Sequence, residues 1–197
     1  MTTYPRSIVI NALEAHAQKS TSPTCVCYIY FRYSDHTQAT VQSLLEVLVK
    51  QTLERHPDCQ ALFDEVYARH IVEKTRPTED ELMALLGRFT GLMVTFYVLD
   101  ALDEAPPSVQ LKILQRLASL KLKLFITSRP LKAVEAHYRD DRLVHHFPIA
   151  AKDEDLNLHI SEQISSTSSP DLWAILEQEA LLRDHVFASI KQKCGGM

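Results

Sequence analysis

The sequence contains little glycine: among its 197 residues there are only Gly87, Gly91, Gly195 and Gly196. None precedes Gly87, and neither Gly-Lys-Ser nor Gly-Lys-Thr occurs anywhere in the chain. Loops that wrap nucleotide phosphates need glycines so that backbone N–H groups can approach the phosphate oxygens closely. The chain as given therefore contains no sequence typical of such a loop.

The chain also lacks long apolar runs and any strong excess of charge of one sign. Its N-terminus has no apolar segment of the secretory type, and no run approaches the length that spans a membrane. The net charge is -4 and the basic residues are scattered, so nothing indicates binding to nucleic acid or to an anionic membrane. A cytoplasmic protein is expected.

Cysteine is scarce, with four residues at Cys25, Cys27, Cys59 and Cys194. Cys25 and Cys27 alternate along a predicted strand, so both side chains point to one face of it. There is no second close pair that would complete a zinc site. We expect these cysteines to be reduced and either to serve packing or simply to be exposed.

Hydrophobic residues make up 46% of the chain and charged residues 23%, which is typical of a globular protein. Apolar runs that suit buried strands alternate with amphipathic helical stretches, a pattern that predicts an α/β fold with a parallel sheet and helices on both faces. Two helix starts are marked, by Ser34-Asp35 and by a capping box at Thr78–Glu81. The strands are expected at 25–31, 93–100, 122–127 and 143–149.

Residues 165–170 are rich in serine and end in proline, which is typical of a linker. We therefore expect a main domain over residues 1–164 and the start of a C-terminal helical subdomain over residues 165–197. The length of the chain suits one domain with a short appendage.

Three carboxylates follow the apolar strand at 93–100, namely Asp100, Asp103 and Glu104. Ligands bind at the carboxyl ends of the strands in open α/β sheets. An Asp at that position can hold Mg²⁺ through its water shell, and a neighbouring carboxylate can polarise an attacking water. Taken alone, the same pattern also fits a solvated acidic turn after a buried strand.

A second polar strand end lies at Thr127-Ser128-Arg129-Pro130. An arginine at this position can contact a terminal phosphate. It can equally pair with a carboxylate such as Asp103 or Glu104, and the two interpretations are compatible.

Together the segments Asp100–Glu104 and Thr127–Pro130 resemble the NACHT-type NTPases of the STAND class. The closest resemblance is to fungal proteins with a nephrocystin-3-like N-terminal domain. Three further stretches are similar to that family and extend the resemblance from about Ser7 to Met197; they are Tyr28–Phe31 with Ser34-Asp35, Ser43–Gln51 and Ile190–Met197.

The resemblance implies a three-layer fold of the P-loop NTPase type, whose Walker B strand ends at Asp100. It implies that Asp100 binds Mg²⁺, that Asp103 or Glu104 activates water, and that Ser128 and Arg129 contact ATP or GTP. It also implies signal transduction through a nucleotide-dependent switch that controls protein partners or self-association.

Relatives carry a Gly-Lys-Ser/Thr loop just before the helix that here begins near Arg6-Ser7. We therefore expect a truncated or decayed copy that lacks the first, phosphate-loop strand. We place that strand between the Walker B strand and the Arg129 strand. Its loss would leave two facing edges unpaired, unless the two strands close up or a partner fills the gap.

Three hypotheses follow. The first is a partial NACHT nucleotide-binding module that does not hydrolyse ATP or GTP by itself. The second is a non-catalytic interaction domain that keeps the NTPase scaffold and binds a related NTPase. The third is an unrelated α/β enzyme that uses Asp100, Asp103 and Glu104 as metal ligands. Only the first explains both strand-end motifs together with the helical stretches around them.

Overall fold

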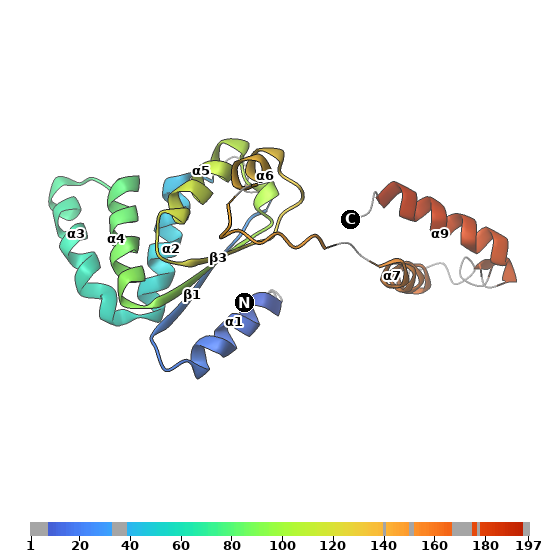
Figure 1. Cartoon of the computed structure of the whole chain (residues 1–197), viewed down its shortest axis with the longest axis horizontal. Helices are drawn as coiled ribbons and strands as arrows, with labels where there is room; N and C mark the ends of the chain where they lie inside the picture. The colour runs from blue at the N-terminus through green and yellow to red at the C-terminus, as the bar shows by residue number, and fades with distance from the viewer. Residues whose placement is uncertain are drawn as a thin grey trace. The chain divides into compact units, whose positions relative to one another are not determined.

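The computed structural model describes residues 8–32, 39–139, 141–149, 152–166, 175–176 and 178–194. The chain divides into two compact units, Met1–Asp141 and Arg142–Met197. Figure 1 labels most of the helices and strands. No helix in these ranges is long and apolar enough to cross a membrane.

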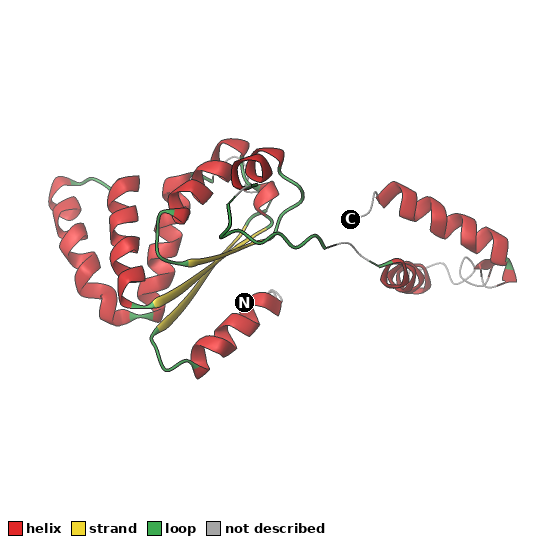
Figure 2. Cartoon of the chain, in the orientation of Figure 1, coloured by secondary structure: helices red, strands yellow, loops and turns green. Residues whose placement is uncertain are grey.

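The first unit is built on a parallel sheet of three strands, β1 (Thr24–Tyr30), β2 (Val94–Asp100) and β3 (Lys123–Ile126), in the order β1-β2-β3. Helices cover both faces of the sheet (Figure 2), with α1 (Ile8–Lys19) on one face and the larger helical layer on the other. The α/β class and the parallel sheet are thus as the sequence predicts.

The larger helical layer consists of α2 (Val41–Arg55), α4 (Glu79–Leu92) and α5 (Pro107–Ala118), with α3 (Gln60–Glu73) packed beside α4. The core lies between this layer and the sheet. The alternating strand residues Cys25, Cys27, Tyr97 and Leu99 face it and are buried. On the opposite face, the ring of His16 on α1 contacts Phe96 edge-on, with 6.0 Å between the ring centroids.

Capping residues explain where two of these helices begin. Thr78 and Glu81 form the predicted capping box of α4, since the Thr78 backbone N–H donates to Glu81 Oε2 at 2.8 Å. The cap of α2 is Thr40, whose hydroxyl accepts a hydrogen bond from the backbone N–H of Ser43. The cap predicted at Ser34-Asp35 lies outside the described residues.

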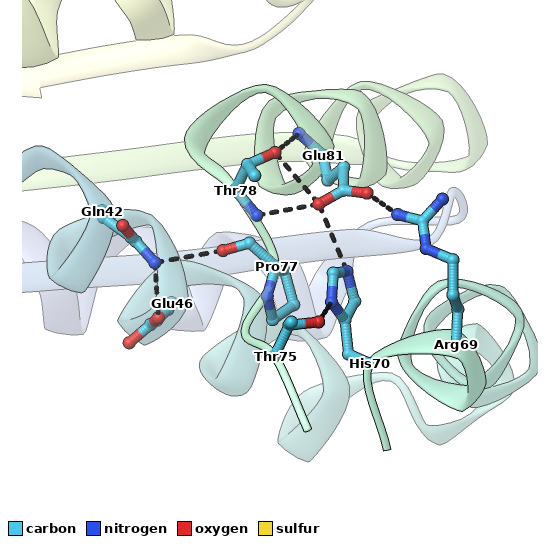
Figure 3. A network of polar contacts seen from close by, with 8 residues as sticks. All are labelled: Gln42, Glu46, Arg69, His70, Thr75, Pro77, Thr78 and Glu81. Atoms are coloured by element: carbon cyan, nitrogen blue, oxygen red, sulfur yellow. Dashed lines mark hydrogen bonds and ion pairs between the residues drawn. The ribbon is translucent and has the colours of Figure 1, made fainter. Parts of the chain in front are cut away.

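Glu81 also joins α4 to the end of α3 (Figure 3). The buried His70 of α3 has its Nε2 3.2 Å from Glu81 Oε2 and its Nδ1 2.7 Å from Thr75 Oγ1. Arg69 forms an ion pair with the other oxygen of Glu81. One carboxylate therefore caps α4 and fixes the turn that precedes it.

No gap separates β2, which ends at Asp100, from β3, which leads to Arg129. β2 pairs directly with β3, from Phe96 opposite Lys123 to Leu99 opposite Ile126. The pairing continues past the strand ends, because the Thr127 N–H donates to the Leu99 carbonyl at 3.0 Å. These hydrogen bonds use the edge of β2 that faces β3. Of the outcomes that the sequence left open, the structure therefore shows the two strands closing up on each other, with no unpaired edge between them.

The strand predicted at 143–149 is also absent, because these residues form a turn followed by irregular chain. Leu143, Phe147 and Ile149 are 88%, 79% and 92% exposed. An alternating apolar pattern makes a strand only when a neighbouring strand supplies hydrogen bonds, and Pro148 lacks the N–H that such pairing requires. The local pattern was therefore misleading.

The remaining described helices are α6 (Lys132–Tyr138) in the first unit and α7 (Asp153–Ser166) and α9 (Ala180–Cys194) in the second. Helix α7 begins at Asp153, as the sequence predicts. The three buried cysteines Cys25, Cys27 and Cys59 are free thiols, which agrees with their predicted role in packing.

Candidate functional site

The site predicted from the sequence lies where β2 and β3 end side by side. After Asp100 the backbone turns through Ala101, which has a left-handed conformation with φ of 57° and ψ of 48°. A short 3₁₀ turn, η3 (Leu102–Glu104), follows and carries the other two carboxylates. Alanine in this conformation costs about 1 kcal/mol, so the surrounding contacts must hold the turn in place.

Thr127 supplies most of those contacts. Its hydroxyl donates to Asp100 Oδ1 and accepts a hydrogen bond from the Ala101 N–H at 2.9 Å. Its carbonyl accepts from the Leu102 N–H at 3.0 Å. Thr127 therefore fixes both the Asp100 carboxylate and the left-handed turn, a role that sequence reasoning missed although the residue belongs to the quoted strand-end motif.

Asp103 and Arg129 form the central ion pair of the site. The Arg129 backbone N–H donates to Asp103 Oδ1 at 3.0 Å, and its Nε donates to Asp103 Oδ2 at 2.6 Å. The Asp103 side chain is 11% exposed, whereas that of Arg129 is 74% exposed. Of the two carboxylates that the sequence offered as partners of Arg129, the structure places Asp103 in this contact.

The charge state of the pair follows from two opposing effects. Burial alone would raise the pKa of Asp103, but the hydrogen bonds from the Arg129 side chain and backbone outweigh it and leave the pKa of the carboxyl below its ordinary value. The same contact raises the pKa of Arg129. Both groups are therefore charged at neutral pH.

Glu104 and Ser128 lie differently. Glu104 lines a small cavity of about 110 Å³ together with the end of β1, including Tyr30 and Phe31. The Ser128 hydroxyl donates to the Arg129 carbonyl. Gln110 of α5, which sequence reasoning also missed, donates to the Ala105 carbonyl at 2.8 Å and so ties the carboxylate turn to α5.

The donor atoms of the site do not by themselves assemble the Mg²⁺ site that the resemblance implies. Asp100 and Asp103 each have a partner within the protein. In the part of the chain that the structure describes, no three Asp, Glu, His or Cys side chains converge in a way that could hold a metal ion.

Neither of the two described glycines lies at this edge of the sheet. Gly87 and Gly91 both lie within α4, which leads into β2 from the opposite end of that strand. Phosphate cradles in α/β folds are built from backbone N–H groups at the carboxyl ends of strands. Among the described residues at the site, Asp103 engages Arg129 and Asp100 engages Thr127.

Comparison with known proteins assigns the chain to a family. The family model described as nephrocystin 3, N-terminal, matches residues 3–129, a range that includes the whole sheet and all five predicted site residues. Searches of curated proteins and of solved structures find no match.

Proposed function

The chain belongs to the nephrocystin 3 N-terminal family, and from this premise we propose that it is a partial NACHT-type module of the STAND class in a signalling NTPase. The module does not hydrolyse ATP or GTP by itself. In this proposal the positions of Asp100, Asp103, Glu104, Ser128 and Arg129 correspond to the metal-binding, water-activating and phosphate-contacting positions of an active relative.

The observation that carries the proposal is the meeting of two strand-end motifs. Asp100 and Asp103 follow β2 and Arg129 follows β3, and the two parallel strands are direct neighbours. Carboxylates and an arginine gathered at adjacent strand ends suit phosphate chemistry better than a solvated acidic turn, in which the side chains would point away from one another.

The absence of independent hydrolysis follows from what phosphoryl transfer requires. The reaction needs a backbone cradle for the phosphates, a metal ion and a positioned water. Here Asp103 is held by Arg129 and Asp100 by Thr127, so each carboxylate would have to exchange an internal partner for a ligand. The described residues supply no cradle that would compensate for this exchange.

A second candidate function is a non-catalytic interaction domain. It is favoured by the apolar side chains on the surface of α3, where Ile71 is 62% exposed and Val72 is 81% exposed. Both candidates predict a folded module without activity of its own. They differ because an interaction domain forms a stable complex with a related NTPase. Size-exclusion chromatography with light scattering of the mixture detects that complex as a mass above those of the partner and of the 22.4 kDa chain.

The proposal is tested by measuring phosphate release from Mg²⁺-ATP and Mg²⁺-GTP by the purified chain. We expect the same low rate for the wild type and for Asp100→Ala. Phosphate release that is well above the buffer rate, and that Asp100→Ala abolishes, would contradict the absence of independent hydrolysis.

A further inference from the structure

A cavity of about 590 Å³ lies at the end of the sheet opposite the candidate site. Its walls are the start of β2 (Val94 and Thr95), the end of α4 (Gly91 and Leu92) and residues 120–123, which connect α5 to β3. This volume is within the range of pockets that hold small organic ligands.

The cavity lies where β2 extends two residues beyond its first pairing with β3. Val94 is paired with Thr24 of β1, but the first residue of β2 that lies opposite β3 is Phe96, which pairs with Lys123. The first two residues of β2 therefore pair with β1 but have no partner in β3. Gly91 adds to this space, since a Cβ atom at that position would have no atom within 4 Å.

Apolar side chains gather around this space although several of them are exposed. Leu92 is 62% exposed and Val94 is 40% exposed, and Met93, Leu120 and Leu122 also line the walls. Exposed apolar groups concentrated around one cavity mark a binding surface more often than scattered ones do. Their burial by an apolar ligand is favourable because it removes apolar surface from water.

The charged residues of the lining are all positive. Lys121 and Lys123 contribute to it, and no Asp or Glu does. The Lys123 ammonium lies 5.1 Å from the centre of the Phe96 ring. Two helices, α4 and α5, end beside the cavity, and each helix C-terminus carries roughly half a negative charge. Even beside these helix ends, the lining offers an anion two lysines and no carboxylate, in a protein whose net charge is -4.

We propose that this cavity binds a small amphipathic anion: a molecule with an apolar body, such as an aromatic ring system, and one acidic group. The apolar body lies against Leu92, Val94 and Leu122, and the acidic group meets Lys121 and Lys123. This inference is independent of the proposed function, because it concerns the opposite end of the sheet and uses none of the strand-end carboxylates.

Two fluorescent probes of nearly the same shape test the proposal with the full chain. The first, 8-anilinonaphthalene-1-sulfonate, has an apolar body and one acidic group, and the second, N-phenyl-1-naphthylamine, has the same body without the charge. Gly91→Leu fills the cavity from α4. Ala84→Leu is its matched control, because Ala84 is exposed on the same helix and does not line the cavity.

We expect Gly91→Leu to raise the Kd of both probes by about tenfold, a loss of about 1.4 kcal/mol, and Ala84→Leu to leave both unchanged. Leu92→Asn provides a second disruption at an exposed position, in case Gly91→Leu fails to fold, and should weaken both probes. Two results would overturn the proposal that this cavity is the binding site. One is wild-type protein that binds neither probe, and the other is equal binding by wild type, Gly91→Leu and Leu92→Asn.

The charge requirement has its own variant. Lys121→Glu should weaken the sulfonate probe by about fivefold, as expected for a solvent-exposed charge contact, and leave the uncharged probe unaffected. Lys132→Glu, at an exposed position on α6 outside the cavity, is the control and should change neither. If Lys121→Glu leaves the sulfonate probe unchanged, or weakens both probes equally, then the site does not select an anion and the proposal is overturned.

Discussion

Arg129 holds Asp103 from two directions, with its backbone N–H 3.0 Å from one carboxylate oxygen and its side-chain Nε 2.6 Å from the other. The contact joins the end of β3 to the turn that follows β2. It also leaves the pKa of Asp103 below its ordinary value, so the pair contributes to stability in a way that depends on pH.

The first prediction concerns this pH dependence. Because the pKa of Asp103 is lowered in the folded state, the unfolded chain binds a proton more readily, and the contribution to stability is present above the unfolded pKa of about 4. It is lost as the pH falls from that value through the lower folded pKa. Urea unfolding at several pH values should show Asp103→Asn less stable than wild type at pH 7.

The difference between wild type and Asp103→Asn should then narrow as the pH falls below about 4. A matched series with Asp64→Asn, which changes an exposed carboxylate on α3, accounts for the general effect of removing a negative charge. A difference that stays constant across the acid range would show that the Asp103 contact does not depend on ionisation.

The second prediction concerns Thr127, whose hydroxyl bonds both Asp100 and the Ala101 N–H. Thr127→Val keeps the shape of the side chain but leaves both partners without the hydroxyl, and should lower the free energy of unfolding by about 1–3 kcal/mol. Thr127→Ser retains the hydroxyl and should lose less than half as much. Equal losses in the two variants would mean that packing, and not the hydroxyl, is what matters.

The third prediction concerns the left-handed turn at Ala101. Glycine adopts this conformation without the clash of a Cβ atom, so Ala101→Gly should raise the free energy of unfolding by up to about 1 kcal/mol. The same substitution at Ala84, in the exposed interior of α4, should lower it by about 1 kcal/mol. Chemical denaturation measures both, and two losses of similar size would show that the turn stores no strain.

The fourth prediction concerns Glu81, which caps α4 and contacts His70 and Arg69. Glu81→Ala removes the cap partner of Thr78 and the carboxylate beside a buried imidazole, and should cost about 1–3 kcal/mol of stability. Glu79→Ala changes another carboxylate in the first turn of α4. It removes surface ion pairs to Lys112 and Arg116 and should cost less than about 1 kcal/mol of stability. Similar thermal stability of the two variants would contradict the importance of the network.

The order of strands and helices could largely be predicted from the sequence, because apolar patterns and capping residues act locally. The apolar run before Asp100 forms β2, and Thr78 with Glu81 starts α4. The expectation of a strand at 143–149 was wrong because pairing between strands is not a local property. Its pattern resembles that of a strand, but whether a strand forms depends on a partner edge that local sequence does not specify.

Within the site, the sequence placed Asp100, Asp103 and Arg129 at strand ends, and the structure brings them together. It could not decide between Asp103 and Glu104 as the partner of Arg129, because that choice depends on the turn through Ala101. Nor did it identify Thr127 as the residue that fixes this turn. An alanine in the left-handed conformation has no sequence signature, since glycine or asparagine is the usual residue there.

We propose above that the module keeps the strand-end residues of a NACHT-type NTPase but does not hydrolyse ATP or GTP by itself, since its described residues supply no cradle that would hold the nucleotide phosphates. Titration of Mg²⁺-ATP and Mg²⁺-ADP into the purified chain, followed by its melting temperature, tests this most directly, because a ligand that binds only the folded state must raise that temperature. We expect no shift in melting temperature at millimolar nucleotide, for wild type and Asp100→Ala alike. A clear shift in the wild type that disappears in Asp100→Ala would contradict it.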